Sequence, residues 1–288
     1  MNGNVSTCNA TVTVRDVIDP VAQCKDTTIY LDASGSITID SSYVDNGSTD
    51  ECGIASIVLN KSVFTCADIG TPQVVTVTAI DNSGNSDICT STITVLDTVA
   101  PTVVCTDTTV YLSAAGTVTI DTTFIDNGSA DACGIASRSI SATSFTCADT
   151  GSNVVTLTVV DIYGNTSSCT ATVTVLDTVA PTAVCRDTTV YLDAVGTVSI
   201  DSTYIENGSS DACGISTIVP SKTAFTCADV GANSVVLSVT DIHGNVGTCT
   251  ATVTVLDTIT PTAVCKDTTV YLSSCLLYTS PSPRDGLL

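Results

Sequence analysis

The segment CTATVTVLDTVAPTAVC, from Cys169 to Cys185, decides the fold, and the chain contains four versions of it. The other three begin at Cys8, Cys89 and Cys249. In the first half of the segment apolar residues alternate with threonines, which is the period of a half-buried β-strand. Pro181 then interrupts strand pairing and holds the residue before it in an extended conformation. The segment is therefore expected to be a junction between the last strand of one repeat and the first strand of the next.

These junctions divide the 288-residue chain into repeats of about 80 residues. Three complete repeats are expected at 20–99, 100–179 and 180–259. Residues 1–19 match the end of a repeat, so we interpret them as the C-terminal remnant of a preceding one. Residues 260–273 match the first strand of a truncated repeat. Residues 274–288 share nothing with the repeats, and we expect them to be a non-native tail.

Each repeat contains roughly six or seven short β-rich segments separated by turn residues, and none has the period of a helix. In the second repeat the strands are expected at Val103–Leu112, Thr117–Ile120, Ala136–Ser141, Val154–Asp161 and from Cys169 onward, with Phe145 in the core. This pattern predicts an all-β chain of tandem Ig-like antiparallel β-sandwich repeats in an elongated array. A tyrosine recurs in the first strand of each repeat and is expected to pack inward: Tyr30, Tyr111, Tyr191 and Tyr271.

Composition restricts the partners and the compartment. Eight basic and 29 acidic residues give a net charge of −21, which disfavours nucleic acid and anionic membranes as partners. The 15 cysteines recur at fixed positions, which indicates an oxidising compartment and therefore an extracellular or cell-surface location. Zinc is disfavoured because the chain has no CxxC pair and its only histidine is His243. No export sequence and no transmembrane segment is recognisable, so direct insertion into a membrane is not expected.

Each repeat has four cysteines, which allow three pairings within it. The first and last strands of an Ig-like sandwich can lie side by side in parallel, so we expect Cys105–Cys169. The segment between Cys133 and Cys147 is short enough to close on itself, so we also expect Cys133–Cys147. Repetition adds Cys24–Cys89, Cys52–Cys66, Cys185–Cys249 and Cys213–Cys227. The rival pairing crosses each linker, as in Cys169–Cys185, and is disfavoured because the next repeat would have to double back along the previous one.

The closing pattern D-x-x-G-N-x-x-x-C-x-A-x-V-x-V-x-D-x-x-x-P-x-x-x-C, from Asp161 to Cys185, resembles the hyalin repeat and its bacterial relatives. The loop DNGSADACGI, from Asp126 to Ile135, is similar to loops in the repeats of large Bacteroidota surface proteins, including gliding-motility adhesins. The resemblance covers residues 3–273. It implies tandem, Ig-like, non-catalytic units of an adhesive or extracellular protein.

Two sets of aspartates are candidate calcium ligands. One opens the D-x-x-G-N hairpins and the other lies in the linkers: Asp81, Asp161 and Asp241, then Asp97, Asp177 and Asp257. Carboxylates gathered near a junction can bind calcium, but the same residues can cap turns on an acidic surface. The acidic loops that begin at Asp45, Asp126 and Glu206 favour the turn interpretation. No other cofactor is expected.

The sequence contains no nucleophile elbow, phosphate-binding loop or histidine cluster, so we do not expect an enzyme. His243 occupies the position of Ser83 and Tyr163 in the other repeats, which indicates an exposed turn residue. The sequence favours the non-catalytic repeat region of a secreted or surface-anchored adhesin-like protein, acting as a disulfide-stapled stalk or adhesive array. Its ligand would be an extracellular surface, a glycan or a protein. The alternatives are a glycan-binding module array or accessory domains of an extracellular enzyme.

Overall fold

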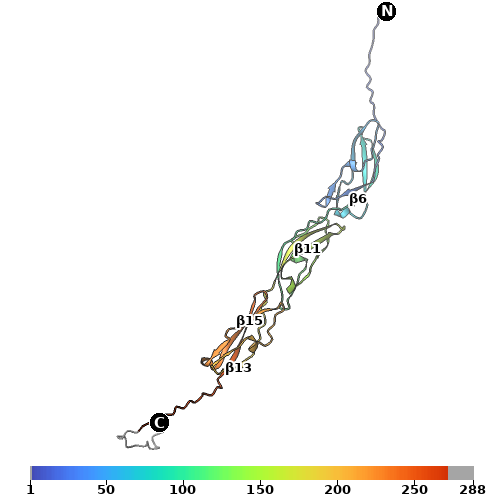
Figure 1. Ribbon diagram of the computed structural model, residues 1–288. Helices are drawn as coiled ribbons and strands as arrows, with labels where there is room; N and C mark the ends of the chain where they lie inside the picture. Colours follow the sequence, from blue (N-terminus) through green and yellow to red (C-terminus); the bar gives the residue numbers. More distant parts are fainter. Residues whose placement is uncertain (1, 272–288) are drawn as a thin grey trace. The chain divides into compact units, whose positions relative to one another are not determined.

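The computed structural model describes residues 2–271, and the regular secondary structure of these residues is almost entirely β-strand (Figure 1). The tail expected at 274–288 lies outside the described residues. The helical segments of the described residues are six 3-10 turns of three residues each. None of them has the length or hydropathy of a membrane-spanning helix. The chain is thus an all-β series of Ig-like sandwich repeats.

The second repeat shows the topology that all three share. Its four-stranded sheet has the order β7 (Thr108–Tyr111), β12 (Thr166–Leu176), β11 (Gly151–Asp161) and β9 (Ile135–Ile140). Facing it is a two-stranded antiparallel sheet made of β8 (Thr117–Thr119) and β10 (Ser144–Thr146). The strands β11 and β12 form one long antiparallel hairpin, whereas β7 runs parallel to β12. This parallel contact is the side-by-side placement of first and last strands that the sequence predicts.

The other two repeats have the same order. The first contains β1 (Thr27–Tyr30), β2 (Ser36–Thr38), β3 (Ile54–Leu59), β4 (Val63–Thr65), β5 (Gln73–Asp81) and β6 (Ser86–Leu96). The third contains β13 (Thr188–Tyr191), β14 (Thr197–Ser199), β15 (Ile215–Pro220), β16 (Ala224–Thr226), β17 (Gly231–Asp241) and β18 (Val246–Leu256). The 3-10 turns are η1 (Ser41–Tyr43), η2 (Cys66–Asp68), η3 (Thr122–Phe124), η4 (Cys147–Asp149), η5 (Ser202–Tyr204) and η6 (Cys227–Asp229).

The core of each repeat lies between the long hairpin and the short strand pair. In the second repeat Val155, Leu157 and Val159 of β11 alternate with outward residues, as a half-buried strand requires. Opposite them Phe145 of β10 is 4% exposed, in agreement with the prediction for this residue. The sequence alternation thus positions a compact apolar layer in every repeat.

The first strand of each repeat is shorter than expected. The sequence predicts Val103–Leu112, but the ladder covers only Thr108–Tyr111, because Thr102 and Cys105 form isolated bridges to the acidic loop instead. Outside the complete repeats, residues 2–20 and 260–271 form no strand. The strand expected within 260–273 is therefore absent over its described part, since no closing strand among the described residues pairs with it.

The packing predicted for the first-strand tyrosines is wrong. Their exposed fractions are 54%, 57% and 58% for Tyr30, Tyr111 and Tyr191, and Tyr271 is also exposed. In β1 the neighbour Ile29 is buried, so the alternation of the strand directs Tyr30 outward.

The described residues form two compact units. The first comprises the chain up to Ala180 together with two loop segments of the third repeat, Asp211–Gly214 and Asp241–Asn245. The second comprises Pro181–Ser210, Ile215–Thr240 and the chain from Val246 onward. The two loop segments matter for function because they contact the second repeat within the first unit.

Candidate functional site

The first unit contains two junctions at which loops of successive repeats meet. At the first junction, Asp97 follows β6 and its side chain accepts a hydrogen bond from the backbone N–H of Val99, at 2.9 Å. The side-chain amide of Asn165 donates to the backbone oxygen of Asp97, at 3.3 Å, and to Oδ2 of Asp161, at 2.7 Å. Asn165 therefore ties the linker to the hairpin of the following repeat.

The second junction repeats this arrangement. Asn245 donates to the backbone oxygen of Asp177 at 3.2 Å and to Oδ2 of Asp241 at 2.8 Å. Asp177 accepts from the N–H of Val179 at 3.1 Å. The linker aspartates and hairpin aspartates that the sequence singles out are thus brought close together, through an asparagine that the sequence analysis did not select. The recurrence of this asparagine after glycine in every D-x-x-G-N hairpin is the sequence signal that could have identified it.

The hairpin aspartates are buried and anionic. Burial alone would raise the pKa of Asp161, but hydrogen bonds from the Asn165 side chain and from the backbone N–H groups of Asn165, Tyr163 and Gly164 hold that pKa below its ordinary value. The same balance lowers the pKa of Asp241. Because each carboxylate already accepts several hydrogen bonds, the turn role accounts for its position.

The acidic loops act as turns, as the sequence favours. Asp126 accepts hydrogen bonds from the N–H of Ser129 and forms an ion pair with Arg138, at 2.8 Å. Asp131 accepts from the N–H of Cys133 at 2.8 Å. Gly128 has a φ of +90°, a conformation that a residue with a Cβ seldom adopts. The loop therefore holds Cys133 in a fixed position two residues before β9 begins.

The three long-range disulfides expected from the sequence are formed in the structure: Cys24–Cys89, Cys105–Cys169 and Cys185–Cys249. The remaining bonds differ. Cys66 is bonded to Cys133, and Cys147 to Cys213, so each of these disulfides joins one repeat to a loop of the next. Both bonds lie within the first compact unit.

The predictions Cys52–Cys66, Cys133–Cys147 and Cys213–Cys227 are therefore wrong. From Cys133 the chain runs the length of β9, which is about 20 Å for six residues. It does not fold straight back, because β9 pairs with β11 and β10 pairs with β8. The short segment between Cys133 and Cys147 therefore does not bring these two cysteines together, although its length suggested that it would. Cys52 and Cys227 are free and exposed.

A glycine makes room for each inter-repeat disulfide. A Cβ at Gly35 would lie 2.8 Å from Sγ of Cys66 and 3.0 Å from Cβ of Ala132, and the φ of Gly35 is +73°. Gly116 stands in the same relation to Cys147 at the second junction. Any larger residue would collide with the sulfur, so the disulfide requires a glycine in this turn.

Further hydrogen bonds cross the junctions beside the disulfides. The hydroxyl of Tyr163 donates to the backbone oxygen of Cys66, at 3.3 Å. His243 occupies the equivalent position at the second junction, where Nδ1 lies 3.1 Å from Oδ2 of Asp177 and Nε2 lies 3.1 Å from Oγ1 of Thr150. His243 is an exposed turn residue, as expected, and its ring in addition connects two repeats.

The order Asp177, His243, Thr150 matches that of an acid, a base and a hydroxyl nucleophile. The hydroxyl of Thr150, however, donates its proton to the backbone oxygen of Cys147, at 3.2 Å. The tautomer of the His243 ring sets whether its Nε2 donates to this hydroxyl or accepts from it. The two contacts join the linker at Asp177 and the turn at Thr150 to the hairpin of the third repeat.

Three carboxylates converge at the second junction, where ligand atoms of Asp177, Asp211 and Asp241 lie within 4.8 Å of one another. Two of these are candidates from the sequence, and Asp211 is an addition. At the first junction Asp97 gathers with Asp131 and Cys133, whose sulfur is committed to a disulfide. The other candidates, Asp81, Asp161 and Asp257, belong to no such group of ligand atoms among the described residues. Asp81 accepts hydrogen bonds from Asn85, and Asp257 is exposed and caps the N–H of Ile259. Calcium binding stays a prediction for the Asp177 cluster.

No protein-family model matches the chain, and no curated protein matches it. Among solved structures, the titin I-band fragment I67–I69 is 11% identical, with 84% of this chain and all of that one covered and a TM-score of 0.39. Sidekick-1 immunoglobulin domains 1–4 are 11% identical, with 82% and 76% covered and a TM-score of 0.33. Similarity at this level carries no functional argument, so the Ig-like assignment rests on the strand order described above.

Proposed function

We propose that this chain is the non-catalytic repeat region of a secreted or surface-anchored adhesin-like protein and that its repeats act as a disulfide-stapled stalk. The observation that carries the proposal is the presence of two kinds of disulfide, one within repeats and one between them. Cys105–Cys169 closes one repeat on itself, whereas Cys66–Cys133 joins neighbouring repeats. The resemblance to hyalin-type repeats of Bacteroidota surface proteins supports the adhesin part. Five disulfides support an oxidising, extracellular setting.

The bridges within the repeats set how far the chain can be stretched. A pulling force that enters near residue 20 and leaves near residue 259 passes through Cys24–Cys89, Cys105–Cys169 and Cys185–Cys249. The sequence separations of these pairs are 65, 64 and 64 residues, and these loops carry no load while the bonds are intact. At ~3.4 Å per residue the three loops shield about 65 nm of chain from extension. A stalk with this property keeps its length under tension.

Single-molecule stretching between the two ends of the repeat region tests the proposal. The oxidised chain should extend without long unfolding steps, and a reducing agent should add up to three steps of about 20 nm each. Replacing both Cys105 and Cys169 by serine should expose one shorter step of about 11 nm without any reductant, because Cys66–Cys133 and Cys147–Cys213 still bypass part of the released loop. Steps of the same length in the oxidised and reduced wild-type chains would overturn the stalk proposal.

A second candidate function is a glycan-binding array, which the exposed tyrosines favour. Tyr30, Tyr111 and Tyr191 occupy the same place in the three repeats and present a flat aromatic ring to solvent. Such rings combine an apolar face with a polar hydroxyl, a combination suited to sugar rings. On a glycan array, the wild-type chain should be retained and the triple alanine variant should lose retention at an unchanged melting temperature. Equal retention of the two proteins would reject this candidate.

A further inference from the structure

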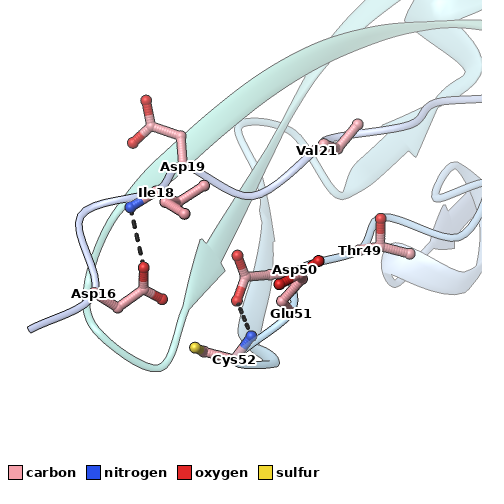
Figure 2. Close-up of a pocket in the computed structure, with 8 residues that line it drawn as sticks. All are labelled: Asp16, Ile18, Asp19, Val21, Thr49, Asp50, Glu51 and Cys52. Atoms are coloured by element: carbon pink, nitrogen blue, oxygen red, sulfur yellow. Dashed lines mark hydrogen bonds between the residues drawn. The ribbon is translucent and has the colours of Figure 1, made fainter.

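Two open cavities among the described residues differ in the charges that line them. Figure 2 shows the cavity beside Cys52, which is lined by four acidic residues and no basic one. The other cavity lies in the third repeat, inside the second compact unit, and has about 500 Å³, which is a size typical of small-ligand pockets. We call it the Arg186 cleft, and its lining includes Arg186, Thr203, Glu206, Asn207, Gly208 and Ile218.

The side chain of Arg186 is held in a fixed position at one wall of this cleft. Its Nε donates to the backbone oxygen of Tyr204 at 3.1 Å, and its Nη2 donates to the backbone oxygen of Thr203. A guanidinium carries five N–H donors, so others remain available after these two bonds. Because Arg186 is exposed, its remaining donors are accessible to a ligand in the cleft.

Glu206 offers a carboxylate oxygen that its equivalents in the other repeats use internally. Its Oε1 accepts from two backbone N–H groups of the loop, at 2.7 and 2.6 Å, and no hydrogen bond to Oε2 is present among the described residues. In the first repeat, Asp45 uses both of its carboxylate oxygens for the N–H groups of the same loop. In the second, Asp126 uses one oxygen in the loop and the other for Arg138.

The second repeat shows which side chain would close the cleft. Ile218 of β15 lines the cleft, and Arg138 has the equivalent position in β9. Nε of Arg138 lies 2.8 Å from Oδ2 of Asp126, and its Nη2 donates to the backbone oxygen of Ser129 at 3.0 Å. Arg138 thus occupies the space that the shorter Ile218 leaves open, and its donors are used within its own repeat.

The loop that forms the cleft takes no part in the contacts between repeats. Those contacts involve the turns at Gly35 and Gly116, the inter-repeat disulfides and the linker aspartates. The equivalent loops of the first two repeats, 45–47 and 126–128, contribute to none of them among the described residues. The cleft is therefore a feature of the repeat itself and does not depend on which repeat comes next.

We propose that the Arg186 cleft binds one neutral pyranose unit of a glycan. A sugar hydroxyl both donates and accepts, and the cleft offers an acceptor in Oε2 of Glu206 together with donors of Arg186 and Asn207. The half-buried Ile218 gives the C–H face of the sugar an apolar contact. The proposal shares only its class of ligand with the glycan candidate above, since it uses none of the first-strand tyrosines, and it is independent of the stalk proposal.

The charges of the cleft favour a neutral sugar over a charged one. Backbone hydrogen bonds from Ser209 and Gly208, together with the charge of Arg186, hold the pKa of Glu206 below its ordinary value, so its carboxylate is ionised at neutral pH. The cleft therefore contains one cation and one anion, in a chain whose net charge is −21. An acidic sugar would be repelled by Glu206 and by the chain as a whole, whereas an uncharged sugar would not.

Glycine-selective isotope labelling of the full chain tests the proposal by NMR, because the backbone of Gly208 lies at the cleft. We expect at least one of the methyl glycosides of glucose, galactose, mannose and N-acetylglucosamine to shift the N–H resonance of Gly208 saturably, with a Kd of about 1–10 mM. The matched internal controls are the equivalent glycines Gly47 and Gly128, whose resonances should not move. The resonance of Gly208 is identified by its loss in Gly208→Asn, since asparagine tolerates the φ of +86° at this position.

Two variants connect the shift to the cleft. In Glu206→Gln an amide N–H replaces the free acceptor while the other oxygen can keep its bonds to the loop, so the affinity should fall at least tenfold. Ile218→Arg copies the second repeat, so it should fill the cleft and abolish the shift. Both variants should melt within about 2 °C of the wild-type chain, which shows that they are folded.

A resonance of Gly208 that none of the four neutral glycosides moves would overturn the proposal, and so would equal shifts at Gly47 and Gly128. Unchanged affinity in both variants would also contradict it. If methyl glucuronide or alanine moved the resonance and the neutral glycosides did not, the cleft would belong to a charged ligand and the proposal would be rejected. The triple alanine variant of Tyr30, Tyr111 and Tyr191 should keep the shift, so failure of one glycan hypothesis is distinguishable from failure of the other.

Discussion

Removing the inter-repeat bridge Cys66–Cys133 should destabilise the first unit without disturbing the disulfides inside the repeats. The bridge closes a loop with a sequence separation of 67 residues. The loss of loop-closure entropy in the unfolded chain then corresponds to about 4 kcal/mol. For a unit of this size, that difference lowers the melting temperature by about 10 °C. The double variant Cys66→Ser/Cys133→Ser is needed because a single change would leave a free thiol that can exchange with other disulfides.

Differential scanning calorimetry at neutral pH measures this effect, and Cys52→Ser is the matched control. Cys52 is exposed and unbonded, so its replacement should shift the melting temperature by no more than about 1 °C. If the cysteines instead paired within the repeat, Cys52→Ser would itself remove a disulfide and lower the melting temperature. An unchanged melting temperature in the double variant, or equal losses in the two proteins, would refute the reasoning.

Three further predictions concern the carboxylates of the junctions. Hydrogen bonds hold the pKa of Asp161 below its ordinary value, so its stabilising contribution is complete above the unfolded-state pKa of about 4 and is lost as pH falls through the lower folded value. In thermal melts across this pH range, the melting temperature of Asp161→Asn should therefore fall less steeply with acid than that of the wild-type chain. Millimolar calcium should raise the melting temperature of the wild-type chain and not that of Asp211→Asn, and identical melting curves with chelator and with calcium would reject the site. Asp16→Asn should lower the pKa of the Cys52 thiol and so speed its alkylation at neutral pH, whereas Asp19→Asn should leave the rate unchanged.

The sequence predicts much of the fold because its alternation is unambiguous. Every second residue of the segment from Ala171 to Val175 is apolar, and these residues are buried in the structure. The parallel contact of first and last strands follows from the repeat architecture, and with it Cys105–Cys169. The exposure of Tyr30 could also have been predicted, because adjacent residues of a strand face opposite sides and Ile29 is the buried one.

The disulfides between repeats could not be deduced from the sequence, for a reason inherent in repetition. Cys147 is equivalent to Cys66, so a bond from Cys133 to either one satisfies the same repeat pattern. Only the path of β9 and β10, which pair with different strands, places Cys133 against Cys66. The role of His243 was hidden in the same way, because its partners Asp177 and Thr150 come from the preceding repeat.

Peptide mapping under non-reducing conditions is the most direct test of the central claim that disulfides join successive repeats. Digestion of the native, alkylated chain should release one linked peptide pair containing Cys66 and Cys133 and another containing Cys147 and Cys213, with Cys52 and Cys227 recovered as alkylated thiols. Linked peptides containing Cys52 with Cys66, or Cys213 with Cys227, would contradict the account.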